Sequence, residues 1–77
     1  MNERFVKIPS YFYEDGLIWF SDLWINPFQI ESLVETDIKY TSPEGDEVET
    51  NGTKIFTKSG MEHDINMTTE ELIKHIS

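Results

Sequence analysis

The sequence predicts an α+β fold: a bent antiparallel β-sheet of five or six strands, in its most curved form a small barrel, with one short C-terminal helix. Apolar residues recur at every second position along much of the chain, which is the periodicity of half-buried strands. Turn-forming dipeptides such as Asp15-Gly16 separate these segments. The last ten residues instead carry helix-start signals. At 77 residues, the chain forms one domain, residues 1–77.

The N-terminal part predicts three strands. Residues 5–13, rich in aromatic and branched side chains, form the first. Asp15-Gly16 turns the chain into a return strand over 17–20, where four consecutive apolar residues indicate burial on both faces. Ser21-Asp22 is a second turn signal, and residues 23–25 then form a short third strand.

The middle of the chain predicts a strand, an acidic segment and two further strands. Asn26-Pro27 ends the preceding strand, because proline lacks the backbone donor, and residues 28–32 form either one helical turn or a bent strand entry. Residues 30–40 alternate apolar and charged side chains. We expect the least order over 42–52, which ends in the hairpin signal Asn51-Gly52. Strands over 53–58 and 61–66 follow.

The C-terminus predicts a helix over 69–76. Thr68 and Glu71 form a capping box, in which each side chain can bond to the other residue's backbone. Met67 and Leu72 are spaced as a hydrophobic staple. A helix of about two turns is not stable alone, so this one has to dock on the sheet. The predicted core comprises Phe5, Ile8, Ile18, Phe20, Ile25, Ile30, Val34, Ile38, Ile55, Ile65, Leu72, Ile73 and Ile76.

The charge of the chain restricts its partners. Fifteen acidic residues against six basic ones give a formal net charge of -9. Such a chain repels nucleic-acid phosphate and anionic lipid, so we expect no direct nucleic-acid binding and no membrane binding. A basic protein surface is the natural complement. The absence of cysteine and of a long apolar segment fits a cytoplasmic protein.

No pattern in the sequence indicates catalysis, a metal site or a cofactor. Nucleophile-elbow, P-loop and dinucleotide motifs are absent. His63 and His75 lack the partners and spacing of metal ligands, and we expect a half-buried His63 and a cationic His75 at the helix end. The acids of residues 44–49 lack the spacing of an EF-hand loop. We therefore predict that the protein is not an enzyme.

The aromatic residues point to a binding function. Seven of the ten lie between Tyr11 and Phe28, and a domain of this size cannot bury them all. Exposed Tyr and Trp side chains are frequent anchors at protein interfaces, and acids can steer a basic partner towards them. The predicted partner contacts are Tyr11, Tyr13, Trp19, Trp24, Phe28, Glu44, Asp46, Glu47 and Glu49.

Several short motifs resemble those of a known family. They are Ile25-Asn26-Pro27, the segment Ile30–Thr36, the strand and turn Thr57–Gly60 and the helix start Thr69–Ile73. Over residues 24–76 the chain is thus similar to the small FlbD/SwrD-like flagellar proteins of bacteria. The resemblance implies a β-hairpin module that ends in a helix, with a role in motility.

These observations favour a small acidic regulator or inhibitor that binds another protein, of the kind that phages and mobile elements often encode. Its target would be a basic or nucleic-acid-handling protein. Mimicry of nucleic acid by the acids is a variant of this hypothesis. The alternative is a structural or assembly protein, in which the aromatic residues close a homo-oligomer. A small-ligand binder or enzyme is a third hypothesis.

Overall fold

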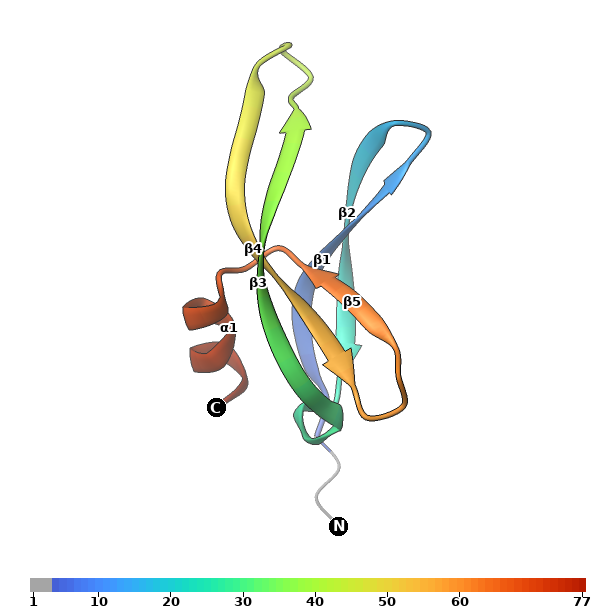
Figure 1. The fold of residues 1–77 in the computed structure, drawn as a ribbon, viewed down its shortest axis with the longest axis vertical. Coiled ribbons are helices and arrows are strands. Elements are labelled where there is room, and N and C mark those ends of the chain that lie inside the picture. Colours follow the sequence, from blue (N-terminus) through green and yellow to red (C-terminus); the bar gives the residue numbers. More distant parts are fainter. Residues whose placement is uncertain (1–3) are drawn as a thin grey trace.

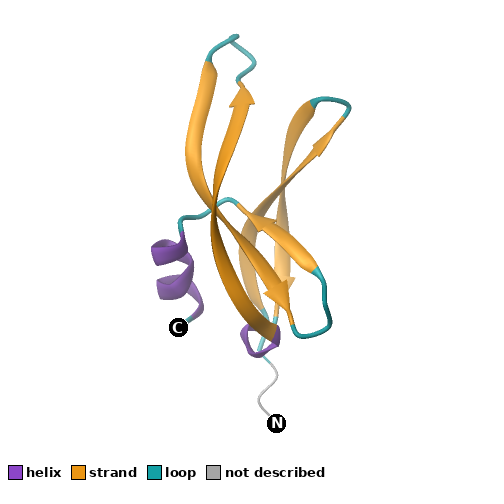
Figure 2. Cartoon of the chain, viewed as in Figure 1, coloured by secondary structure: helices purple, strands orange, loops and turns teal. Residues whose placement is uncertain are grey.

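The computed structural model describes residues 4–77 as one antiparallel sheet with a C-terminal helix (Figures 1 and 2). The strand order is β2-β1-β5-β4-β3. Strands β2 and β3 are therefore the edges of an open sheet rather than neighbours in a closed barrel, and the α+β prediction is confirmed. The elements are β1 (Val6–Glu14), β2 (Leu17–Ile25), the 3-10 helix η1 (Pro27–Gln29), β3 (Ile30–Thr41), β4 (Glu47–Thr57), β5 (Glu62–Ile65) and α1 (Thr69–Ile76).

The β1–β2 hairpin forms around the predicted Asp15-Gly16 turn. Both residues have positive φ, 54° and 77°, as the type I′ turn that suits twisted strands requires. The prediction of a second turn at Ser21-Asp22 is wrong, since β2 continues through these residues to Ile25. Ser21 pairs with Ser10 and Asp22 with Pro9 in an unbroken register, and this ladder outweighs the local turn preference.

The β3–β4 hairpin is longer than predicted. Its loop covers only residues 42–46, and β4 already begins at Glu47. The prediction of a turn at Asn51-Gly52 is wrong, because both residues lie within β4. Gly52 is needed for close packing instead. A Cβ atom there would lie 2.6 Å from Ile38 Cδ1 and 2.9 Å from the Ile65 carbonyl oxygen.

Helix α1 has the predicted bounds and the predicted capping box. The Glu71 backbone amide donates to Thr68 Oγ1, and the Thr68 amide donates to Glu71 Oε1, each at 3.2 Å. Thr53 Oγ1 donates to the Met67 carbonyl oxygen (3.0 Å), which fixes the approach to the helix. His75 Nε2 donates to the carbonyl oxygen of Lys7 (2.7 Å) and ties the helix end to β1.

The core lies under the helix, in the lower half of the sheet in Figure 1. We call this half the base. The core prediction is wrong for four residues, since Phe5, Phe20, Val34 and Ile73 are about half exposed or more. An eight-residue helix is too short to cover the whole sheet, so these four side chains, which lie outside the area it covers, remain exposed to water. The buried cluster consists of Ile8, Ile25, Ile55, Ile65 and Leu72, and Val6, Leu23, Ile30, Leu33, Met67 and Ile76 pack against it.

Above the base the two hairpins separate, as Figure 1 shows. We call the upper part of the β1–β2 hairpin, residues 10–21, the first arm, and the upper part of the β3–β4 hairpin, residues 36–52, the second arm. The molecule measures 48 × 24 × 18 Å, and its radius of gyration is 13.3 Å, against about 11.5 Å for a compact chain of this length. Its accessible surface of 5573 Å² likewise exceeds the roughly 4,900 Å² expected for its mass. The arms account for this open shape.

Candidate functional site

The two arms face each other through aromatic side chains. Cross-strand pairing of Tyr11 with Phe20 and of Tyr13 with Ile18 places these four residues on one face of the first arm. The Phe20 ring meets Tyr40 of the second arm edge to face, with 5.7 Å between ring centroids. The Tyr13 hydroxyl donates to the carbonyl oxygen of Lys39 (3.0 Å). The inner faces of the arms are therefore in contact.

This contact loosens from the base towards the arm tips. Ile38 is fully buried and Tyr11 is only 8% exposed, whereas Tyr13, two residues nearer the tip, is 54% exposed. Phe20 lies opposite Tyr11 on the edge strand β2 and is 52% exposed. A cavity of about 540 Å³ opens there between residues 17–20 of β2 and residues 40–43 of β3 and its loop. We call it the inter-arm cleft. Its volume is within the range of about 300–1,000 Å³ that is usual for ligand sites.

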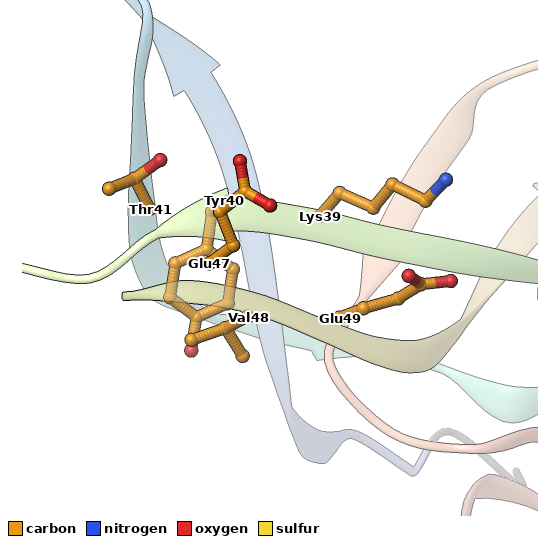
Figure 3. A pocket seen from close by; sticks show the side chains of 6 residues that line it. All are labelled: Lys39, Tyr40, Thr41, Glu47, Val48 and Glu49. Carbon is orange, nitrogen blue, oxygen red and sulfur yellow. The ribbon is translucent and has the colours of Figure 1, made fainter. Parts of the chain in front are cut away.

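The negative charge gathers on the second arm. Residues 35–49 contain six acids and one lysine. Glu47 and Glu49 lie on the same face as Lys39 and Thr41, around a second hollow of about 410 Å³, and Tyr40 and Val48 point to the other side (Figure 3). In the part of the chain that the structure describes, the two ion pairs, Lys7–Asp22 and Lys54–Asp64, both lie elsewhere.

The outer face of the first arm is apolar. Phe12 and Trp19 are cross-strand partners, and they are 46% and 49% exposed. Leu17, two residues before Trp19, is 58% exposed on the same face. Trp19 Nε1 makes only a long contact with the carbonyl oxygen of Glu14 (3.4 Å). Water thus reaches both faces of this arm, which explains why the apolar run over 17–20 is not buried on both faces as predicted.

The structure divides the predicted contact residues among three places. Tyr13 and Trp19 lie on the first arm, whereas Trp24 (62% exposed) and Phe28 (59% exposed) lie in the base. Tyr11 is not available as an exposed anchor, because it is buried where the arms meet. This burial raises the pKa of the Tyr11 hydroxyl above 10.0. The predicted acids Glu44, Asp46, Glu47 and Glu49 are all exposed on the second arm or its loop.

Sequence reasoning missed Phe20 and Tyr40 as residues of a site. Phe20 was expected in the core, and Tyr40 was assigned to neither the core nor the partner contacts. The hairpin register was the available signal for Phe20. A two-residue turn at Asp15-Gly16 pairs residue 20 with residue 11 and so places Phe20 on the tyrosine-bearing face. The sequence held no comparable signal for Tyr40, since its partner comes from a different hairpin.

Two further features of the described residues concern metal ligands and membrane-spanning helices. Among residues 4–77, no three His, Asp or Glu side chains are grouped so that they could hold a metal ion. His63 is half-buried, as expected, next to Ile55 in the β4–β5 pairing. Within the same residues no helix has the length and apolar character needed to cross a membrane.

Comparisons of the chain with protein-family models, with curated proteins and with solved structures gave no match.

Proposed function

We propose that this protein is a small non-enzymatic regulator or inhibitor that binds another protein, one with a basic or nucleic-acid-handling surface, in the cytoplasm. One observation carries the proposal: six of the seven aromatic side chains between residues 11 and 28 are 46% or more exposed. Exposed rings of this kind are costly to hydrate, and they are the side chains that contribute most to protein interfaces.

The charge distribution supports a basic partner. The six acids of residues 35–49 produce a negative field beside the aromatic cleft. Such a field raises the association rate of a basic protein, and it repels nucleic acids and acidic proteins. Because these acids are concentrated on one arm, mimicry of nucleic acid is a form that the proposed inhibition could take.

An affinity pull-down from the native lysate tests the proposal, with Trp19→Ala and Trp24→Ala as variants and a high-salt wash as a further condition. We expect a partner that is retained by the wild type and weakened by salt, because exposed charges are screened. Loss of the partner with Trp19→Ala alone would place the contact on the first arm. If no partner is retained under any condition, the proposal is wrong.

Self-association is the second candidate function. The apolar patch of Phe12, Leu17 and Trp19, together with the unpaired edges of β2 and β3, is a surface of the kind that forms homo-oligomers. A structural role in motility, as the resemblance to FlbD/SwrD-like proteins implies, would fit such an assembly. A net charge of -9 on every copy opposes it. Light scattering at low micromolar concentration distinguishes self-association from binding of another protein. A stable oligomer favours self-association.

A further inference from the structure

The inter-arm cleft combines three properties that together define one kind of ligand. Its walls are apolar, they are formed by edge strands, and acids border them. The first property follows from the residues that line it, chiefly Leu17, Ile18, Trp19, Phe20 and Tyr40. Because Phe20 and Tyr40 already touch edge to face, a further apolar side chain inserted beside them would meet preformed aromatic surfaces.

The second property is that the cleft lies between the two edges of the sheet. Residues 17–20 belong to β2 and residues 40–41 to β3, and within the described part of the chain neither strand has a neighbour on its outer side. Edge strands present free backbone N–H and C=O groups, to which an extended segment can hydrogen-bond. The geometry therefore suits an extended chain better than a helix.

The third property is the charge at the border of the cleft. The second hollow, with Glu47 and Glu49, shares Tyr40 and Thr41 with the cleft, and Glu44 and Asp46 lie in the loop just beyond Pro43. Glu47 and Glu49 lie with Lys39 on the face of the second arm opposite Tyr40, so a segment that runs along the β3 edge reaches the two faces with alternate side chains. Residues 39–49 contain these four acids and one lysine. A second copy of this chain would bring its own charge of -9 to this border, so charge complementarity favours a basic occupant.

We infer that the inter-arm cleft binds an extended basic segment of another protein, with one large apolar side chain inserted beside Phe20 and Tyr40 and with lysine or arginine side chains next to Glu47 and Glu49. This inference rests on the proposed function and specifies the class of segment that the partner presents. The exposed rings of the base, Trp24 and Phe28, are then not required for this contact.

Titration with three synthetic nine-residue peptides, followed by two-dimensional NMR of the ¹⁵N-labelled protein, tests the inference. One peptide is basic with a central Phe, one is basic with a central Ser, and one is acidic with a central Phe. We expect saturable shifts only with the first, at residues 17–20 and 40–49. At doubled ionic strength the dissociation constant should rise severalfold, since the charges are exposed.

Variants locate the contact on the protein. Phe20→Ser should weaken binding of the basic Phe peptide by about tenfold or more, because it removes one wall of the cleft. Glu47→Gln combined with Glu49→Gln should weaken it by about fivefold. Phe5→Ser and Glu62→Gln, which change an exposed ring and an exposed acid away from the cleft, are the matched controls and should leave binding unchanged. The amide spectrum shows whether each variant remains folded.

Four results would overturn the inference. Equal binding of the acidic Phe peptide removes the charge argument, and equal binding of the basic Ser peptide removes the inserted side chain. Shifts that gather around Trp24 and Phe28 move the contact to the base, which leaves the proposed function intact. No binding by any peptide at millimolar concentration eliminates the cleft as a peptide site, and the pull-down then decides the proposed function separately.

Discussion

The base and the arms are parts of one sheet, but they treat similar residues differently. In the base, a helix covers the sheet, and five apolar side chains are 7% exposed or less. In the arms, no helix among residues 4–77 covers the strands, and away from Ile38 and Tyr11, where the arms meet, Phe12, Tyr13, Trp19 and Phe20 are each about half exposed. The strands of both regions carry large apolar side chains, so the difference in exposure comes from the helix, which covers the base and not the arms. The comparison indicates that the base supplies most of the buried core and that the arms leave large side chains exposed, which is why we propose the arms as the binding surface.

The largest expected effect is in the base. Leu72 is fully buried and joins α1 to the sheet, so Leu72→Ala should lower the free energy of unfolding by about 2–5 kcal/mol. Phe20→Ala removes a larger side chain, but one from a half-exposed position, and should cost about 1 kcal/mol or less. Denaturant unfolding measures both. Equal losses would show that the arms carry as much of the stability as the base.

A second substitution tests the junction of base and arms. Gly52→Ala places a methyl group against the Ile38 side chain and against the backbone oxygen of Ile65, which cannot move aside. We expect a loss of about 1–3 kcal/mol in the free energy of unfolding. Thr50→Ala, at an exposed position of the same strand, is the control. If Gly52→Ala is as stable as the wild type, the arms can open without cost to the base.

The helix cap gives a smaller effect. Thr68→Ala removes the acceptor for the Glu71 amide and should lower the free energy of unfolding by about 1 kcal/mol. Thr68→Ser keeps a capping hydroxyl and should retain most of the stability. Thermal unfolding of the two variants measures the difference. A similar loss in both would mean that the threonine methyl group, rather than its hydroxyl, stabilises this end of the helix.

The smallest effect concerns the buried tyrosine of the arms. Because the pKa of Tyr11 is raised in the folded protein, its contribution to stability is complete below pH 10.0 and is lost as the pH rises through the folded-state pKa. Tyr11→Phe cannot ionise at this position, so the stability of this variant should fall less steeply above pH 10. Urea unfolding of the wild type and of Tyr11→Phe at pH 9 and pH 11 measures how far the free energy of unfolding falls with pH in each protein. An equal fall in the two proteins would contradict burial of the Tyr11 hydroxyl.

The sequence predicted the elements that depend on local chemistry. The turn at Asp15-Gly16 and the capping box of Thr68 and Glu71 are defined by residues a few positions apart, and both are confirmed. Period-two alternation also predicted the strand over 30–40, although a register shift between Ile30 and Ser32 places Leu33 opposite Ile55. Such features need no knowledge of the tertiary structure.

The candidate site depends on tertiary structure and was predicted only in part. The excess of exposed rings followed from counting aromatic residues, and it is confirmed. The sequence could not show which half of the sheet the helix covers, so Phe20 was assigned to the core. Nor could it show that Tyr40 meets Phe20 across two hairpins. The same limit explains Gly52, whose close neighbours Ile38 and Ile65 come from two other strands.

Few backbone hydrogen bonds join the β1–β2 hairpin to the rest of the sheet, strands β3 to β5. Between β1 and β5 the ladder consists of one residue pair, Ser10 with Ile65, and the Asn66 amide adds a bond to the Pro9 carbonyl oxygen. Strands β3 and β4, by contrast, pair along nearly their whole length. In native-state hydrogen exchange, amides along this seam should therefore exchange sooner than those of the β3–β4 ladder. A seam that yields first would act as a pivot, and a small rotation about it would change how far apart the hairpin tips stand.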